Sequence, residues 1–535
     1  MALAAAVVVA AAVVVTIIVA SGTPAGRPTK PAPARFPGPD GVEARWVLDQ
    51  NRLPGTTSWQ IPRRVIQGAI EGFANENYAV AGEDVSFYVS TAARTFVVDA
   101  YRMGYYQGKG AHLAWVSGRI VGRTQPACPV LGGIGVNMVS CSNWTKSFTL
   151  RLPKNFVQGD YLFKLIAGPR VQSYVPLTVW DPTSHATYLL MNRTFTEEGW
   201  NTFGGYSFYQ GQGACPAGAP SYPVCNRARI VSFDRPYNTG NGAADFFGEE
   251  YPLIVFCEQH GLDLAYVTDV TVTQHPSIVA NHKVVLSLGH DESWSYQERV
   301  GVADAVHKGT NVVFFGAASV LRHVRLQASP LGADREEVDY RDSDADPLNG
   351  HGSAMEVTGN TWSSPPSSWP ETSLVGEYYS GYLDPGSTAS FVVADAKSWV
   401  FAGTGLHDGS VLPGVLASDI DHVIDGPPTP STLEVLGHSP ISLSSIYTNQ
   451  GEWNGFTYSD MTYFTFPHRG AGVIDTGDNN WINAMGGGTC PAHGGCPIGE
   501  LDRITGNILR MFGRGPAGRF EPSVPNLGAI SPRGS

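Results

Sequence analysis

The sequence predicts an all-β domain of the immunoglobulin-like sandwich type, followed by an α/β domain with a parallel sheet. Three observations predict this fold class. Short runs of alternating hydrophobicity, separated by turn residues, fill residues 60–180. From residue 187 onward, apolar runs typical of strands alternate with helical patterns. The 62 glycines and 38 prolines make nearly a fifth of the 535 residues turn-formers, which argues against an all-helical fold.

Composition limits the partners that the chain can have. With 42% hydrophobic and 15% charged residues, the chain is neither disordered nor a multi-span membrane protein. The formal net charge of -12 repels phosphate backbones, and no basic patch offsets it. We therefore expect no nucleic-acid partner. The sequence contains no pattern that specifies an oligomeric state.

The N-terminus has the composition of a membrane segment. Residues 2–20 carry no charge, and a helix of that length would span roughly 28 Å, about the hydrocarbon thickness of a bilayer. We expect residues 1–22 to be a transmembrane anchor or an uncleaved signal segment, and residues 23–58 to be a Pro-rich linker. The protein is then a cell-membrane protein with extracytoplasmic domains, or a secreted one if the leader is cleaved.

The cysteines favour an oxidising compartment. Six of the seven form three sequence-near pairs in loops, which predicts the disulfides Cys128–Cys141, Cys215–Cys225 and Cys490–Cys496. The last pair has a metal-knuckle alternative, although its spacing matches no zinc pattern. The seventh, Cys257, lies in a helical pattern and is interpreted as a buried, inert thiol.

The sandwich is predicted over residues 59–182. Its strands are expected in runs with period-two alternation bounded by turn signals, at 78–90, 95–103, 147–153, 159–168 and 173–180.

The α/β domain is predicted over residues 183–513. Its clearest unit is a strand at 283–289, a polar loop, a helix from 295 to 308 opened by a Ser295/Glu298 capping box, and a returning strand at 311–316. Such a βαβ unit places the loop at the carboxyl end of a strand, where α/β sheets bind ligands. Strands at 398–405 and 471–477 and a helix at 501–512 should complete the domain, with an acidic and Ser/Pro-rich insertion at 334–390 and a disordered tail at 514–535.

The loop of the βαβ unit reads Gly-His-Asp-Glu-Ser-Trp from 289 to 294. His290 and Glu292 have the residue types of a general acid/base pair, or of a metal ligand with a proton-transfer partner. The structural alternative is a loop whose carboxylates cap the following helix. Serine-hydrolase elbows, zincin motifs and phosphate-binding loops are missing from the sequence.

These residues carry a resemblance to a known family. Residues 250–270, 289–295 and 309–326, with further pieces at 202–209 and 231–237, resemble the C-terminal domain of the N,N-dimethylformamidase beta (large) subunit and its actinobacterial relatives. The resemblance covers about residues 185–512 and implies a glutamine-amidotransferase-like α/β fold with amidohydrolase activity.

The resemblance also implies one iron ion, held by two tyrosines and one glutamate. Glu292 matches the glutamate, His290 a second-sphere or proton-transfer residue, and Tyr209 is the candidate tyrosine. Hard oxygen ligands suit Fe(III), which would polarise an amide carbonyl or acidify a bound water. The segment TFTEEGW at 194–200 has no tyrosine where the family's first one is expected, and Glu197 or Glu198 is the possible substitute ligand.

Four further segments contain candidate substrate-binding residues. Asp234 and Arg235 follow a strand, although an adjacent Asp and Arg also suit a structural ion pair. His407 and Asp478 follow late strands, and Trp294 is either a stacking wall or part of the core.

The sequence therefore predicts an extracytoplasmic amidohydrolase-like protein that cleaves a C–N bond of a small amide. Glu292 is its metal ligand and His290 moves the proton. The alternative is a non-catalytic protein that binds a cell-envelope glycan or peptide on the same scaffold. Both hypotheses require Glu292 to face an open cavity.

Overall fold

The computed structural model describes residues 35–530 apart from residues 134, 214–222, 427, 442–445, 448–457, 469 and 489–496. Within these ranges, no helix has both the length and the apolar character needed to cross a membrane. The predicted membrane segment at 1–22 and the predicted Cys490–Cys496 bond lie outside the described residues.

Residues 35–58, predicted as part of a linker, belong to the folded protein, and residues 23–34 lie outside the described residues. Strands β1 (Arg35–Pro37) and β2 (Val42–Ala44) form a hairpin that leads into α1 (Arg45–Gln50). Arg35 forms an ion pair of 2.6 Å with the buried Asp263, and the Ala44 amide donates to the Gly261 carbonyl. These contacts fix the segment on the α/β part of the protein.

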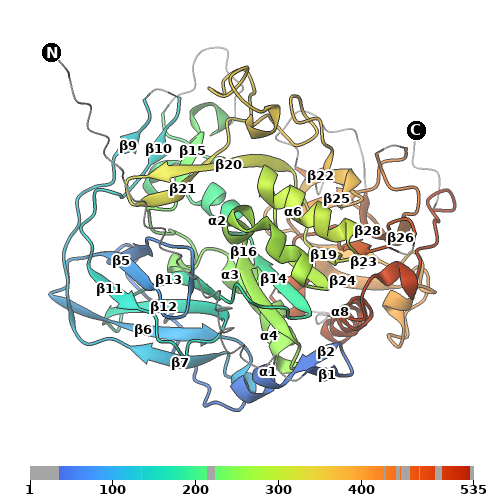
Figure 1. The fold of residues 1–535 in the computed structure, drawn as a ribbon, viewed down its shortest axis with the longest axis horizontal. Helices are drawn as coiled ribbons and strands as arrows, with labels where there is room; N and C mark the ends of the chain where they lie inside the picture. Colours follow the sequence, from blue (N-terminus) through green and yellow to red (C-terminus); the bar gives the residue numbers. More distant parts are fainter. Residues whose placement is uncertain are drawn as a thin grey trace, which may run out of the picture.

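Two sheets with a shared core make up the next part of the chain, in blue to cyan in Figure 1. Along β5 (Asp84–Thr91) every second side chain is buried, as expected of a strand with one face on a core. The first sheet has the order β11-β5-β3, with β3 (Ile70–Ala74) and β11 (Phe148–Arg151). The second has the order β4-β13-β12-β6-β7, with β4 (Tyr78–Val80), β6 (Thr95–Met103), β7 (Ala111–Val116), β12 (Gly159–Gly168) and β13 (Val171–Trp180).

The Cys128–Cys141 disulfide is confirmed. Cys225 is also disulfide-bonded, but its predicted partner Cys215 lies outside the described residues. Cys257 is a buried free thiol, and burial raises its pKa above the usual range.

A seven-stranded mixed sheet organises the rest, with the order β16-β14-β17-β19-β29-β28-β26. The first five strands are parallel, β28 runs antiparallel to them, and β26 runs antiparallel to β28. Along β17, Leu286 packs with α4 and α8, while Val285 packs with α5 and α6 on the other face. Because both faces are covered, the parallel strands are mostly apolar. The strands are β14 (Tyr188–Asn192), β16 (Leu264–Thr268), β17 (Val284–Leu288), β19 (Asn311–Phe315), β26 (Glu434–Pro440), β28 (Tyr458–Thr465) and β29 (Gly472–Asp475).

The helices include the predicted crossover helix. It is α6 (Tyr296–His307), and its N-terminus has the capping box of Ser295 and Glu298. The others are α2 (Thr194–Trp200), α3 (Phe246–Glu249), α4 (Tyr251–Gln259), α5 (Asp269–Gln274), α7 (Trp481–Met485) and α8 (Ile498–Phe512).

Two predicted features of this part are wrong. Residues 398–405 are not a strand: Trp399–Phe401 form a short 3-10 helix against α8, and Gly403 and Gly405 have φ of +75° and +76°. Residues 514–530 are described and packed, since Asn311 donates to the Gly515 carbonyl and Asn526 to the Val435 carbonyl. The apolar run at 398–405 and the Gly/Pro-rich tail both have packing partners that are distant in sequence.

A four-stranded sheet lies over the carboxyl ends of the parallel strands, near the top of Figure 1. Its order is β15-β21-β20-β18, with β15 (Ile230–Ser232), β18 (Ser293–Ser295), β20 (Arg322–Ser329) and β21 (Gly332–Val338). The predicted insertion therefore begins inside β21. Two smaller sheets contain β22 (Tyr378–Leu383), β25 (Asp419–His422) and β27 (Ile446–Tyr447), and β23 (Ala389–Val392) with β24 (Val411–Leu416).

Candidate functional site

The loop between β17 and β18 is held rigidly at the carboxyl end of β17. Gly289 has a φ of +59°, and a Cβ there would lie 2.7 Å from the Glu249 Cβ and 2.8 Å from its carbonyl oxygen. The His290 amide donates to the Glu249 carboxylate at 2.9 Å. A residue larger than glycine would therefore push the loop away from the α3–α4 segment.

The two acids of this loop have different environments. Asp291 accepts a hydrogen bond of 2.6 Å from Ser287, and its burial raises the pKa to about 6. The amides of Glu292 and Ser293 donate to the Thr196 hydroxyl at 3.0 and 3.1 Å. The cap of α6 is Ser295 and not a loop carboxylate. The helix-capping interpretation of Glu292 is therefore wrong.

Glu292 faces an open cleft with a volume of about 1410 Å³. Its Oε1 accepts from Arg322 Nε at 3.1 Å, and its Oε2 accepts from the Tyr209 hydroxyl and from Trp200 Nε1 at 3.3 Å. Burial alone would raise the pKa, but the interactions with His290, Arg322 and Arg341 outweigh it and lower the Glu292 pKa to about 2. Glu292 is therefore a carboxylate at neutral pH.

His290 lies between two carboxylates. Its Nε2 is 3.5 Å from Glu292 Oε2, and its Nδ1 is 4.0 Å from Asp419 Oδ2 in β25. Among the described residues, Nε2 has no hydrogen-bond partner although it is buried. His290 therefore lines the cleft with a buried ring nitrogen that faces Glu292 and makes no hydrogen bond within the described ranges.

Tyr209 is clamped between two side chains. The Trp200 ring stacks on it at 3.7 Å between centroids and 7° between planes, and the Arg341 guanidinium carbon lies 4.1 Å from its ring centre. Because Trp200 covers one face, Arg341 occupies the other. Burial raises the pKa of Tyr209 well above its ordinary value, so the phenol is protonated and donates to Glu292.

The donors around Glu292 can be compared with the iron site that the resemblance implies. Tyr209 and Glu292 are in contact, as two ligands of one ion must be. The indole N–H of Trp200 and the guanidinium of Arg322 also contact the Glu292 carboxylate. Both groups are hydrogen-bond donors only, so neither can be a metal ligand. In the described ranges, no three His, Cys, Asp or Glu side chains are arranged to hold a metal. A second tyrosine, Tyr379, lines the same cleft, where its hydroxyl hydrogen-bonds Asp419 and its pKa is raised by burial, Asp419 and Glu292. The cleft therefore contains two phenols and a carboxylate, but both oxygens of that carboxylate already accept hydrogen bonds from protein side chains.

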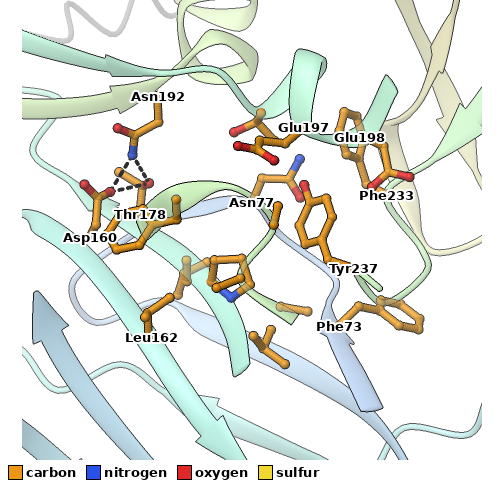
Figure 2. Close-up of a pocket in the computed structure, with 18 of the residues that line it drawn as sticks. Phe73, Asn77, Asp160, Leu162, Thr178, Asn192, Glu197, Glu198, Phe233 and Tyr237 are labelled. Carbon is orange, nitrogen blue, oxygen red and sulfur yellow. Dashed lines mark hydrogen bonds between the residues drawn. The ribbon is translucent and has the colours of Figure 1, made fainter. Parts of the chain in front are cut away.

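The substitute ligands Glu197 and Glu198 do not reach this cleft. Both line a second, smaller cavity of about 80 Å³ between α2 and strands β3, β12 and β13 (Figure 2). Glu197 pairs with Arg193 at 2.7 Å and Glu198 with Arg235 at 2.5 Å. Each carboxylate has its own arginine, so neither acts as an extra oxygen ligand beside Glu292.

Several predicted substrate-binding residues lie outside the cleft. Trp294 is fully buried in the hydrophobic core beside Phe314, so the core interpretation is correct. Asp234 pairs with Arg335 at 3.0 Å below the surface, and Arg235 is the partner of Glu198. Asp234 and Arg235 therefore do not pair with each other, and each belongs to a separate ion pair.

The two candidates that follow the late strands also miss the cleft. His407 is exposed and contacts the Asp408 carbonyl. Asp478 is fully buried and accepts from the amides of Ala417 and Asn480. The two residues after Asp478, Asn479 and Asn480, do line the cleft.

Sequence reasoning missed most residues that contact Glu292. Trp200 ends the TFTEEGW segment, at the place where a family tyrosine was sought, and this was the available signal. The other residues of the site lie on distant segments: Arg322 is in β20, Arg341 follows β21, and Asp419 is in β25. No local pattern links these segments to the GHDE loop.

Comparisons with known proteins give one informative match. A family model described as N,N-dimethylformamidase beta subunit-like, C-terminal, matches residues 97–494, a range that contains the cleft. A search among curated proteins found no match. One similar solved structure is a Paenibacillus cycloisomaltooligosaccharide glucanotransferase complexed with cycloisomaltoheptaose. The identity is 9% and the TM-score 0.15, and the match covers 49% of this chain and 29% of that chain. At this TM-score the likeness supports no argument.

Proposed function

Because the chain belongs to the N,N-dimethylformamidase beta subunit-like, C-terminal family, we propose that its cleft hydrolyses the C–N bond of an amide. The observation that carries the proposal is the position of His290 between the carboxylates of Glu292 and Asp419 in the lining of a large cleft, with a buried Nε2 that has no hydrogen-bond partner among the described residues. An imidazole oriented by carboxylates is a recurrent general base in hydrolases.

The side chains of the cleft suggest a division of roles. His290 takes a proton from water, the water oxygen adds to the amide carbon, the C–N bond breaks, and the same proton passes to the leaving amine. Glu292, with a pKa of about 2, is too weak a base for this step and instead stabilises the positively charged imidazole. Asp419 faces Nδ1 and orients the ring.

Amine release from a panel of amides tests this function. We expect His290→Gln to lower kcat/KM by about 100-fold or more, the usual contribution of a general base. His407→Gln is the matched control, because His407 is exposed and does not line the cleft. Equal activity of both variants would contradict the proposal, as would a wild-type protein that hydrolyses no amide of the panel.

The family resemblance predicts bound iron, whereas the side chains around Glu292 predict none, and no step of the mechanism above depends on the ion. Metal analysis and the visible spectrum of the purified protein test it, since tyrosinate bound to Fe(III) gives colour. Given Trp200 and Arg322 beside Glu292, we expect no stoichiometric iron. A coloured protein with one iron per chain, lost in Glu292→Ala, would contradict our interpretation of the donor set.

A second function, non-catalytic binding of a cell-envelope glycan or peptide, has one observation in its favour. Both oxygens of Glu292 already accept hydrogen bonds from side chains, and Trp200, Tyr379 and Tyr382 line the cleft. Aromatic rings in an open cleft suit sugar or peptide ligands. This function predicts ligand binding without turnover that is unchanged in His290→Gln.

The location and domain types remain part of the proposal. The Cys128–Cys141 disulfide supports an oxidising, extracytoplasmic compartment. The two-sheet part supports an immunoglobulin-like sandwich, and the parallel strands with helices on both faces support a glutamine-amidotransferase-like domain. Protease protection of the folded part in intact cells, compared with lysed cells, distinguishes the two sides of the membrane.

A further inference from the structure

One wall of the cleft contains three guanidinium groups, which we name the arginine wall: Arg227, Arg229 and Arg341. The chain segments that carry them lie side by side. Arg227 donates to the carbonyls of Asp339 and Tyr340, and the Asp339 amide donates to the Arg229 carbonyl. Three positive charges are thereby held together by backbone pairing.

The charges of this wall are poorly compensated. Arg341 Nε pairs with Asp339 at 2.7 Å. No carboxylate of the described residues lies within 4.0 Å of the guanidinium of Arg227 or Arg229, and Arg227 donates only to main-chain carbonyls. Burial and the neighbouring Arg341, Arg229 and Arg322 lower the pKa of Arg227 to about 9. The wall therefore has an excess of positive charge that an anion in the cleft would relieve.

Arg341 lines the cleft and has one buried donor without an acceptor among the described residues. Its side chain is only 8% exposed, and its Nη2 has no hydrogen-bond partner among the described residues. A buried, charged N–H without an acceptor is destabilising. A bound oxygen atom would remove this destabilisation.

The arginine wall is close to the reacting centre. The Arg341 guanidinium lies against the ring of Tyr209, whose hydroxyl contacts Glu292. An anion on Arg341 is therefore separated from Glu292 by about one aromatic ring. The cleft of about 1410 Å³ is also larger than a site for a small neutral amide requires.

We propose that the substrate is an amide with a carboxylate beside the scissile bond, an N-acyl amino acid, and that the arginine wall binds this carboxylate. A guanidinium matches a carboxylate with two parallel N–H donors. In an N-acyl amino acid one carbon separates the carboxylate from the amide nitrogen, which agrees with the short distance from Arg341 to Glu292. The proposal rests on the proposed function for the bond that is cleaved, and on the arginine wall for the group that is recognised.

Calorimetric titration with N-acetyl-L-alanine and with its methyl ester tests this inference. Binding is measured in His290→Gln protein, so that turnover does not interfere. We expect the acid to bind at least ten-fold more tightly than the ester. Equal affinities, or binding of neither compound, would overturn the proposal.

Variants of the arginine wall locate the carboxylate. Arg229→Gln and Arg341→Lys should each weaken binding of the acid by ten-fold or more and leave the ester unaffected, with thermal unfolding as the check on folding. Arg119→Gln is the matched control, because Arg119 is an exposed arginine in the loop after β7 and does not line the cleft. Acid binding that is unchanged in Arg229→Gln and Arg341→Lys contradicts the inference. If the acid binds as expected but no amide is hydrolysed, the proposed function fails, the compound is a ligand and not a substrate, and only carboxylate binding by the arginine wall stands.

Discussion

Glu292→Gln removes the negative charge that Arg322 and the neighbouring cations surround. The substitution keeps the size of the side chain and an oxygen that can accept from Tyr209 or Trp200. It leaves Arg322 Nε, now 3.1 Å from a carboxylate oxygen, without its ion pair. The change therefore isolates the electrostatic part of the site.

The pKa of Glu292 gives the magnitude. A fall of the carboxyl pKa from 4.5 to about 2 in a side chain that is 3% exposed corresponds to about 3 kcal/mol of stabilisation. Breaking a buried ion pair costs a similar 3–5 kcal/mol or so. We expect Glu292→Gln to lower the free energy of unfolding by about 3 kcal/mol at pH 7.

The pH dependence follows from the sign of this shift. A carboxyl group whose pKa is lowered by folding contributes its full stability above about pH 4.5, and loses it as the pH falls toward 2. The gap between wild type and Glu292→Gln should therefore be roughly 1 kcal/mol smaller at pH 3.5 than at pH 7.

Urea unfolding, followed by tryptophan fluorescence at both pH values, measures this gap. Glu83→Gln is the control, because Glu83 is exposed and no arginine of the described residues lies within 4.0 Å of its carboxylate. A Glu292→Gln protein as stable as wild type at pH 7, or a gap that does not change with pH, would refute the electrostatic reasoning.

Three further changes have definite expected outcomes. Gly289→Ala would bring a Cβ within 2.7 Å of Glu249, so amide hydrolysis, measured by amine release, should fall at least ten-fold and the melting temperature should drop. Arg102→Met breaks the fully buried pair of 2.5 Å with Glu258 that joins β6 to α4, and urea unfolding should show a loss of about 3–5 kcal/mol. Replacing both Cys128 and Cys141 by alanine removes a cross-link over 13 residues and should cost about 3 kcal/mol by calorimetry. An unchanged rate of amide hydrolysis, an unchanged free energy of unfolding or an unchanged calorimetric stability would contradict the role given to the contact that the change removes.

Local sequence patterns predicted the framework of the site. The βαβ unit around the GHDE loop was predicted because apolar runs, the Ser295 capping box and Gly309 are all local signals. The same signals placed Glu292 and His290 at the carboxyl end of β17, and the structure has them there, beside an open cleft. Tyr209 beside Glu292 was suggested only by the family resemblance.

The rest of the site depends on contacts between distant segments. Arg322 and Arg341 reach the cleft because β20 and β21 pair in a separate sheet above the parallel strands. Trp294, by contrast, follows Glu292 by two residues, a spacing that places two side chains on the same face of a strand. Its side chain enters the core while that of Glu292 faces the cleft, because Glu292 belongs to the loop before β18 and not to the strand. No pattern within the GHDE loop distinguishes these outcomes.

A crystal structure with a phosphonamidate analogue of N-acetyl-L-alanine tests the central claim most directly, because its tetrahedral phosphorus replaces the reacting carbonyl carbon. We expect a phosphonyl oxygen within about 3 Å of His290 Nε2 and the carboxylate on Arg341. Binding of the analogue away from His290, or in the small cavity beside α2, would contradict it.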